Sequence, residues 1–311
     1  MDNGPRVPGP FVVGVDGGGT GSRAMVMALD GREISTAAGP PALIEPRDPG
    51  AAAGAVAGTV AAALEGARVG PPAAALWAGL AGAGPPDPRE AVETALRSLG
   101  IAEAVCVGMD VEAAHRDAFQ GEAGILVVLG TGSMLWGRDP EGREVRVGGW
   151  GTLLGEEAGG YWFGLQGLRA VARARDGRAE PTLLSATLLE KLRLPDPPAL
   201  IPWIAGASKG KVAALAPLVL EAAGQDDGPA RAILDQGLAQ LRSHLEVARR
   251  AWEPWGGAFA AALVGGLAEE GGPLRGLAAE AIQDAGGILR EGPVVPVRGA
   301  ARMALSLLRT G

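Results

Sequence analysis

Residues Val12–Gly31 read VVGVDGGGTGSRAMVMALDG, and this stretch decides the fold of the first part of the chain. An apolar run ends at Asp16, three glycines and a threonine follow, and a second apolar run leads to Asp30-Gly31. Short apolar runs bounded by turn residues are typical of buried strands, and Asp-Gly favours a tight hairpin turn. The sequence therefore predicts an antiparallel meander of three strands, at residues 11–15, 24–29 and 32–37.

The glycine turn between the first two strands has the composition of an anion-binding loop. Glycine lets the backbone approach a ligand closely, and successive amides can form an anion-binding hollow. We predict that Gly18, Gly19 and Thr20 bind phosphate. Asp16 is then expected to hold Mg²⁺ through water, because Mg²⁺ gives up its water ligands reluctantly. The alternative is an ordinary glycine hairpin in which Asp16 is a turn residue.

Two other glycine-rich motifs fit this loop less well. A Walker loop needs a lysine after its glycines, and no lysine lies near these. Residues 19–24 do match a dinucleotide-binding fingerprint, but that fingerprint must open a helix between two parallel strands. Only nine residues separate Gly21 from Gly31, and they end in a hairpin signal. A phosphate loop inside a meander is therefore favoured.

The rest of the chain repeats one order of elements. After the meander, helices are predicted at 50–66, 88–98 and 110–119, and strands at 73–80 and 104–109. A second meander follows, with strands at 124–129, 134–137 and 144–147. After it come a long helical stretch from about 156 to 174 and beyond, a helix at 229–252, a strand at 258–264 and a helix at 297–308. We predict an α/β protein of two domains, each a mixed sheet flanked by helices, with a ligand bound in the cleft between them.

The second meander has its own glycine turn at the equivalent position. Gly130, Thr131, Gly132 and Ser133 follow the apolar run GILVVL. Gly-Thr-Gly also occurs in ordinary turns, so the motif alone indicates little. Its occurrence at the same point of a repeated unit makes a second phosphate loop the favoured interpretation.

Asp110 closes a predicted strand and begins a predicted helix. One interpretation is a helix N-cap, a frequent role of aspartate. The other is a general base that takes the proton of a substrate hydroxyl during phosphoryl transfer. The two roles are compatible, and we favour catalysis provided that the phosphate loops are real.

A third group of candidates lies in GGWGTLLGEEAGGYWFG, residues 148–164. Aromatic side chains are rare in this chain, yet Trp150, Tyr161 and Trp162 occur here, and they could form a wall for a sugar ring. Glu156 and Glu157 could hydrogen-bond its hydroxyls. The alternative is a tight loop followed by a helix whose first turn carries acids that suit the helix dipole.

A fourth candidate is the glycine pair in LVGGLAEE, residues 263–270. Gly265 and Gly266 follow a strand and precede a helix, so their backbone could lie against an adenine ring. In isolation the pair equally fits a turn.

Composition excludes several classes of protein. The chain has 311 residues and a net charge of −7, which argues against binding nucleic acid. A single cysteine and two distant histidines argue against a disulfide framework, a cluster held by several thiolates, or a His/Cys zinc site. We expect no membrane span and no signal peptide, a loose tail at residues 1–10, and a cytoplasmic location.

The motifs GVDGGGTGSRA, MD before a helix, VLGTGS, GGWGTLLGEEAGGYW and LVGGLA occur in the order that is typical of one group of proteins. This series resembles that of N-acetylglucosamine kinase-like proteins of the BadF/BadG/BcrA/BcrD ATPase family, within the superfamily of acetate and sugar kinases, heat-shock chaperones and actin. The resemblance runs from about residue 11 to 309. It implies two ribonuclease-H-like (actin-like ATPase) domains, at 1–120 completed by a helix at 296–311, and at 121–295.

The resemblance also implies roles for the candidate residues. ATP and Mg²⁺ would be the cofactors, and a homodimer is plausible. Roles follow for the metal (Asp16), the catalytic base (Asp110), the phosphates (Gly18, Gly19, Thr20, Gly130, Thr131, Gly132, Ser133), adenosine (Gly265, Gly266) and the sugar (Asp110, Gly149, Trp150, Glu156, Glu157).

Two departures from the family pattern concern the sugar. Members that resemble N-acetylglucosamine kinase usually carry an asparagine near residues 42–43, where this chain has GPPALIEP. Their Gly-Asp-Glu-Gly is here Gly155-Glu156-Glu157-Ala158. The single Cys106 argues against the branch of the family that holds iron–sulfur clusters.

The expected function is an ATP-dependent kinase for N-acetylglucosamine or glucosamine, acting at the 6-hydroxyl. One alternative is an ATP-driven switch or regulatory protein without a sugar acceptor. The other is a kinase whose acceptor is not an ordinary sugar.

Overall fold

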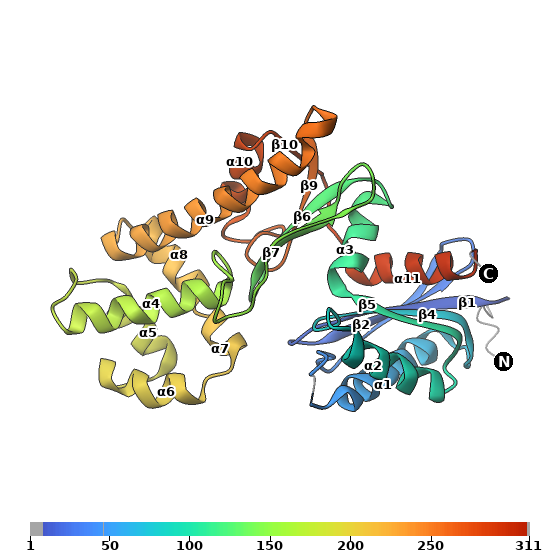
Figure 1. Ribbon diagram of the computed structural model, residues 1–311. Coiled ribbons are helices and arrows are strands. Elements are labelled where there is room, and N and C mark those ends of the chain that lie inside the picture. Colours follow the sequence, from blue (N-terminus) through green and yellow to red (C-terminus); the bar gives the residue numbers. More distant parts are fainter. Residues whose placement is uncertain (1–8, 46, 310–311) are drawn as a thin grey trace. The chain divides into compact units, whose positions relative to one another are not determined.

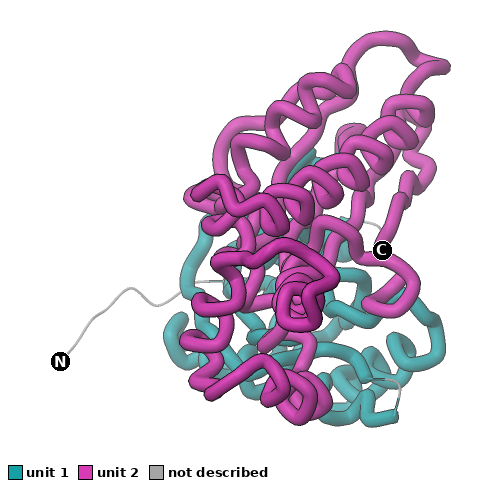
Figure 2. Tube along the Cα trace, turned by 90° about the vertical axis from the view of Figure 1, so that its left-hand side faces the viewer, with its two compact units in different colours: residues 1–121, 294–311 teal, residues 122–293 magenta. Residues whose placement is uncertain are grey.

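The computed structural model describes residues 9–45 and 47–309, so most of the tail expected at residues 1–10 lies outside the described residues. The chain divides into two compact units (Figures 1 and 2). Unit 1 contains residues 1–121 and 294–311, and unit 2 contains residues 122–293. The C-terminal segment is thus part of the same unit as the N-terminal segment.

Unit 1 is built on a five-stranded sheet in the order β3-β2-β1-β4-β5. Strands β1, β4 and β5 are parallel to one another, while β2 and β3 continue the sheet antiparallel. In chain order the elements are β1 (Phe11–Gly17), β2 (Ser22–Ala28), β3 (Glu33–Gly39), α1 (Pro49–Ala67), β4 (Ala73–Leu80), α2 (Pro86–Ser98), β5 (Ala102–Met109), α3 (Asp110–Phe119) and α11 (Pro296–Leu307).

Helices cover both faces of this sheet, as Figure 1 shows. On one face, α1 buries a stripe of side chains at every fourth position, from Ala52 through Val56 and Val60 to Leu64, and α2 packs beside it. On the other face, α3 and α11 enclose a second core around Trp77. Coverage of both faces explains why the parallel strands are apolar at nearly every position.

Helix α1 is, among the described residues, the one helix long and apolar enough to cross a membrane by length and composition. Its apolar stripe packs against β2 and β3 and forms part of the core of unit 1. This position is that of a core helix, so its composition does not indicate a membrane protein.

Unit 2 repeats the topology of unit 1. Its sheet has the order β8-β7-β6-β9-β10, with β6, β9 and β10 parallel and β7 and β8 antiparallel. The elements are β6 (Gly124–Leu129), β7 (Ser133–Arg138), β8 (Glu144–Gly148), α4 (Gly160–Arg175), α5 (Leu184–Leu192), α6 (Leu200–Gly206), α7 (Lys209–Ala213), α8 (Ala216–Gly224), α9 (Gly228–Trp252), β9 (Phe259–Val264), α10 (Arg275–Asp284) and β10 (Gly287–Leu289). The predicted fold class, two mixed sheets each flanked by helices, is confirmed.

The predicted start of the first long helix of unit 2 is wrong. The helix expected from about residue 156 begins at Gly160, because residues 149–159 form a tight loop instead. In this loop Gly151 and Gly155 form an isolated bridge, and Ala158 has a positive φ of 64°. The helix starts only where the amide of Gly160 donates to the carbonyl of Gly130, at 2.8 Å.

Candidate functional site

The first glycine loop, residues 18–21, joins β1 to β2 and is held by two backbone hydrogen bonds. The Gly18 amide donates to the Gly21 carbonyl at 3.0 Å, and the Ala42 amide donates to the Gly18 carbonyl at 3.1 Å. The amides of Gly19, Thr20 and Gly21 donate to no other group in the described part of the chain. Gly19 and Thr20 are exposed. Three consecutive free amides at a surface can bind an anion.

Asp16 and Asp110 lie at the same edge of the sheet of unit 1. Asp16 is paired with Gly79 of β4, which is in turn paired with Gly108 of β5, two residues before Asp110. Because Gly79 has no side chain, the backbone of Asp110 lies close to β4: a Cβ added there would be 3.3 Å from the Asp110 Cα. The carboxyl ends of parallel strands thus bring both aspartates together beside the first loop.

Both carboxyl groups are harder to ionise than usual. Burial, and then the neighbouring Asp110 carboxylate, raise the pKa of Asp16 to about 7, while Arg23 acts in the opposite direction. Burial likewise raises the pKa of Asp110, although the Val111 amide donates to its Oδ1 at 3.0 Å. Two coupled carboxylates in this state are stabilised by a cation placed near them.

A hydrated Mg²⁺ ion fits this pair of aspartates. Mg²⁺ is commonly held by one or two carboxylates, and its remaining ligands are water and substrate phosphates. No cluster of three or more histidine, cysteine, aspartate or glutamate side chains occurs among the described residues. Two carboxylates therefore suit an ion that takes most of its ligands from water and substrate phosphates better than they suit a structural metal.

Asp110 is the first residue of α3, and Met109 occupies the N-cap position. The Glu112 side chain accepts a hydrogen bond from the Met109 amide at 2.8 Å. Glu112 therefore takes over the capping that one interpretation had given to Asp110. The Asp110 carboxylate is left at the positive end of the helix, where it accepts a hydrogen bond from the Val111 amide.

The second glycine loop joins β6 to β7 in unit 2. The Gly130 amide donates to the Gly132 carbonyl at 2.9 Å, and the Tyr161 amide donates to the Thr131 carbonyl at 2.8 Å. The amides of Thr131 and Gly132 make no hydrogen bond to another described residue. Ser133 is buried, and its hydroxyl donates to the Glu157 carbonyl. The loop thus presents backbone amides, while the Ser133 side chain fastens it to residues 156–159.

The Glu156 side chain packs against Gly132 of this second loop. A Cβ added to Gly132 would be 2.7 Å from the Glu156 carboxyl carbon, so glycine at position 132 makes room for this side chain. Lys209 completes the arrangement, since its Nζ lies 2.6 Å from Glu156 Oε2. The sequence motifs did not indicate Lys209, because 52 residues lie between it and Glu156 and no motif contains it.

The other predicted sugar residues follow β8. Trp150 is 70% exposed, and the Arg146 guanidinium lies 5.8 Å from the centre of its ring. Glu157 is half-buried, and its negative charge favours protonation of His244, whose pKa is nevertheless lowered by burial. Gly149 has a positive φ of 69°, as a tight turn requires. His244, on α9, is a second residue that the motifs did not indicate.

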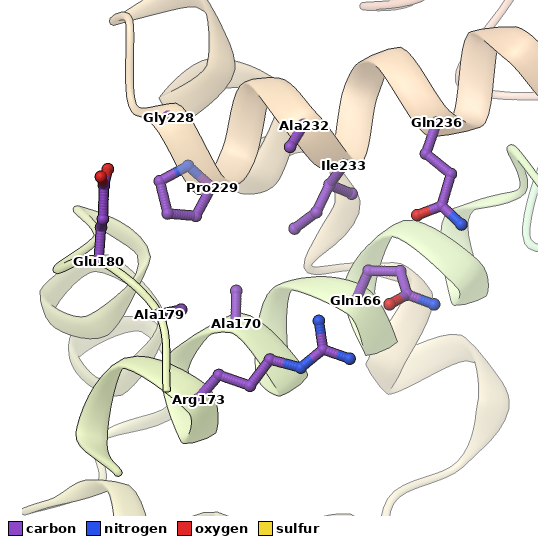
Figure 3. A pocket seen from close by; sticks show the side chains of 10 residues that line it. All are labelled: Gln166, Ala170, Arg173, Ala179, Glu180, Gly228, Pro229, Ala232, Ile233 and Gln236. Carbon is purple, nitrogen blue, oxygen red and sulfur yellow. The ribbon is translucent and has the colours of Figure 1, made fainter. Parts of the chain in front are cut away.

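A small hollow of about 220 Å³ lies beside this loop. Its walls come from residues 152–157 and from the first turns of α4, including Tyr161 and Trp162. A larger hollow, of about 340 Å³, lies farther along α4, where Gln166 and Arg173 face Gln236 and the start of α9 (Figure 3). The first hollow contains the predicted sugar-site acids, and the second contains none of the predicted site residues.

Gly265 and Gly266 directly follow β9, beside the second glycine loop. Gly265 has a φ of 98°, and a Cβ there would lie 2.7 Å from the Leu129 carbonyl carbon. The Leu267 amide donates to the Leu129 carbonyl at 3.0 Å. The structure therefore groups the predicted residues into two sets, one at the strand ends of each unit.

Comparison with known proteins gives a consistent result. The model of a family described as the BadF/BadG/BcrA/BcrD ATPase family matches residues 13–304. Over 169 residues the chain is 34% identical to an N-acetylmuramic acid/N-acetylglucosamine kinase of Clostridium acetobutylicum, covering 54% of this chain and 55% of that protein. Over 114 residues it is 40% identical to an N-acetyl-D-glucosamine kinase of Dictyostelium discoideum, covering 36% of each.

A solved structure is similar over almost its whole length. It is that of a protein from Chromobacterium violaceum whose assignment as an N-acetylglucosamine kinase is provisional. The TM-score is 0.76 at 28% identity, and the match covers 95% of this chain and 99% of that one. The two curated relatives, in contrast, are matched over about half and about a third of their lengths.

Proposed function

Because this chain belongs to the BadF/BadG/BcrA/BcrD ATPase family, we propose that it is an ATP-dependent kinase that phosphorylates an amino sugar, N-acetylglucosamine or glucosamine, at the 6-hydroxyl. The observation that carries this proposal is the pair Asp16 and Asp110 beside a loop with three free amides. The acceptor is supported by the names of the relatives, which are kinases of N-acetylated amino sugars.

Each glycine loop is proposed to bind nucleotide phosphate through its backbone amides. Gly18, Gly19 and Thr20 would contribute backbone amides from unit 1, and residues 130–133 would contribute amides from unit 2. Gly265 and Gly266 adjoin the second loop, which supports a position for adenosine there. Asp16 is proposed to hold Mg²⁺ through water, and the ion would neutralise charge on the phosphates.

Asp110 is proposed as the general base. Its carboxylate would accept the proton of the sugar hydroxyl while the hydroxyl oxygen forms a bond to the γ-phosphorus and the bond to the ADP oxygen breaks. A carboxylate with a raised pKa is a stronger base than an exposed one, and burial gives Asp110 that property. In this family of reactions, position and charge neutralisation supply most of the rate enhancement.

The sugar is proposed to contact the loop at residues 148–159. Trp150 offers an exposed aromatic face, Gly149 offers backbone groups, and Glu156 and Glu157 offer carboxylates. Glu156 is already paired with Lys209, so Glu157 is the acid of the two that has no ion-pair partner among the described residues. The preference for a particular amino sugar is therefore proposed to depend more on Glu157 and Trp150 than on Glu156.

Replacing Asp110 tests this proposal. Asp110→Asn keeps the shape of the side chain but removes the base, so sugar-dependent release of ADP should fall by about 10²- to 10⁴-fold. Binding of ATP should stay within about threefold of the parent protein, since the loops are unchanged. ADP release in a coupled assay and ATP affinity by calorimetry measure the two quantities. Undiminished turnover would remove Asp110 from the mechanism.

A further inference from the structure

The second glycine loop, which is proposed to bind phosphate, has a negatively charged side chain packed against it. Its free amides at Thr131 and Gly132 suit an anion, yet the Glu156 carboxylate packs against Gly132. The Glu156 side chain is only 12% exposed, so water screens its charge poorly. A negative group in this place opposes the binding of phosphate to the loop.

Lys209 provides the opposite charge at this point. Its ammonium lies 2.6 Å from Glu156 Oε2, and the two groups form an ion pair. Oε2 is buried and has no hydrogen-bond partner among the described residues. Lys209 is thus the one cation paired with this carboxylate in the described part of the chain, while its own side chain remains 42% exposed.

The fold holds Lys209 in place through two glycines of α4. Gly160 lies next to Ala213, with 3.2 Å between an added Cβ and the Ala213 Cβ, and a Cβ on Gly164 would clash with the Val212 carbonyl. Helix α7 therefore packs closely on the first turns of α4, and Val212 is buried there. The same turns of α4 donate the backbone hydrogen bonds to the second loop, so the start of α4 positions both Lys209 and the loop.

We infer that Lys209 is a positioning residue that neutralises Glu156 beneath the second phosphate loop and thereby permits nucleotide phosphates to bind there. This inference rests on the nucleotide-binding part of the proposed function and is independent of the sugar. Lysine occurs only three times in the chain, at 191, 209 and 211. Its side chain suits this role, because a compact charge on a flexible stem can move to contact either a carboxylate or a phosphate.

Four variants of the full chain test this inference through their affinity for ATP, measured by calorimetry. Lys209→Met leaves Glu156 unneutralised, so we expect affinity to fall at least tenfold. Glu156→Gln removes the opposing charge and leaves the lysine, so affinity should rise several-fold. The double variant Lys209→Met/Glu156→Gln should return to within about threefold of the parent. Lys211→Met is the matched control in the same short helix: Lys211 forms no ion pair with a described residue, so this replacement should leave the affinity for ATP unchanged.

The sign of the Glu156→Gln effect separates this role from a merely structural one. If the pair only held the loop in shape, either single replacement would weaken ATP binding and the double variant would be no better. That pattern, or unchanged affinity in Lys209→Met, would overturn the inference. Raising the salt concentration should narrow the difference in ATP affinity between Lys209→Met and the parent, because the effect is electrostatic.

Two further measurements keep the test decisive. Circular dichroism shows whether Lys209→Met folds, and if it does not, Glu156→Gln alone still gives the sign. If the parent protein binds neither ATP nor ADP, the proposed function fails before any variant is compared. If it binds nucleotide but no sugar accelerates ADP release, only the acceptor is wrong, and the role of Lys209 can still be measured.

Discussion

Gly18 and Gly19 are glycines that the fold of unit 1 does not require. Neither has a positive φ, and an added Cβ at either position would meet no atom within 4 Å. Ordinary turn geometry would therefore allow alanine. Glycine at these positions suits the close approach of a ligand to the backbone, as the proposed phosphate binding requires.

Gly19→Ala separates folding from binding for this reason. We expect the midpoint of thermal unfolding to stay within about 2 °C of the parent, since nothing is displaced. Affinity for ATP should fall about tenfold or more, because the new methyl group stands where phosphate would lie against the amides. Thermal unfolding and calorimetry on the same preparation measure both. Full ATP affinity in this variant would show that the first loop does not contact the nucleotide.

Asp16 makes the metal-free protein sensitive to pH. Its pKa is about 7 in the folded chain and 3.8 without the fold, so between these values the folded state binds more protons than the unfolded state. Stability therefore falls as pH rises through this interval, by up to about 4 kcal/mol from this group. The penalty is absent below about pH 4 and complete above about pH 7.

Asp16→Asn should remove that penalty. In a chelator and without nucleotide, the variant should be more stable than the parent at pH 8, and the difference should shrink as pH falls toward 4. Urea unfolding at several pH values measures it. Equal pH dependence in the two proteins would mean that Asp16 ionises freely in the fold.

Single residues also mark the limit of what the sequence could predict about the site. Asp16, Asp110 and the two glycine loops follow strands, and strand ends can be located from apolar runs. Lys209 could not be found in this way, because its contact with Glu156 depends on how α7 packs on α4. The exposure of Trp150, and the pairing that distinguishes Glu156 from Glu157, also arise from tertiary packing.

Among the elements, α3 and α11 are joined by a buried carboxylate. Asp117 of α3 is fully buried and accepts hydrogen bonds from Arg298 at 2.6 and 2.8 Å and from Arg302 at 3.0 Å. It also accepts from the Val295 amide at 2.8 Å, just before α11 begins. This one side chain therefore adds a polar attachment of the C-terminal helix to the apolar core that α11 shares with the rest of unit 1.

Asp117→Ala should loosen this attachment. Removing one partner of a buried ion pair typically costs about 3–5 kcal/mol, because the remaining charges lose their partner. Hydrogen exchange followed by mass spectrometry should show faster exchange in peptides from α3 and α11, with peptides from α9 unchanged. Arg302→Ala, at a partly exposed partner, is the control and should have a smaller effect. Protection equal to that of the parent in α11 would contradict this account of the attachment.

Element boundaries were predictable where one strong local signal sets them. Strands β4 and β6 and helix α3 have the bounds that the apolar runs and Asp110 indicate. The helices between residues 184 and 224 were not predicted as separate elements, only as a helical stretch continuing beyond residue 174. They have five to nine residues each, too few for a clear period, and they are stabilised by packing on α4 and α9. The late start of α4 at Gly160 depends on a hydrogen bond to Gly130, which no local pattern shows.

At the scale of the whole molecule, the two units share one strand order without a shared sequence pattern beyond the glycine loops. The order of predicted elements was sufficient to identify the repeat. The acceptor could not be predicted in this way, because the departures from the family pattern at residues 42–43 and at Glu156 both lie in segments assigned to the sugar. The fold therefore predicts nucleotide chemistry more firmly than it predicts the substrate.

ADP release by the parent protein with ATP, Mg²⁺ and a panel of sugars tests the proposed kinase activity most directly. We predict that N-acetylglucosamine or glucosamine accelerates ADP release at least tenfold over the rate without sugar, with the corresponding 6-phosphate identified by mass spectrometry. Slow ATP hydrolysis that no sugar accelerates would contradict the kinase and favour an ATP-driven switch.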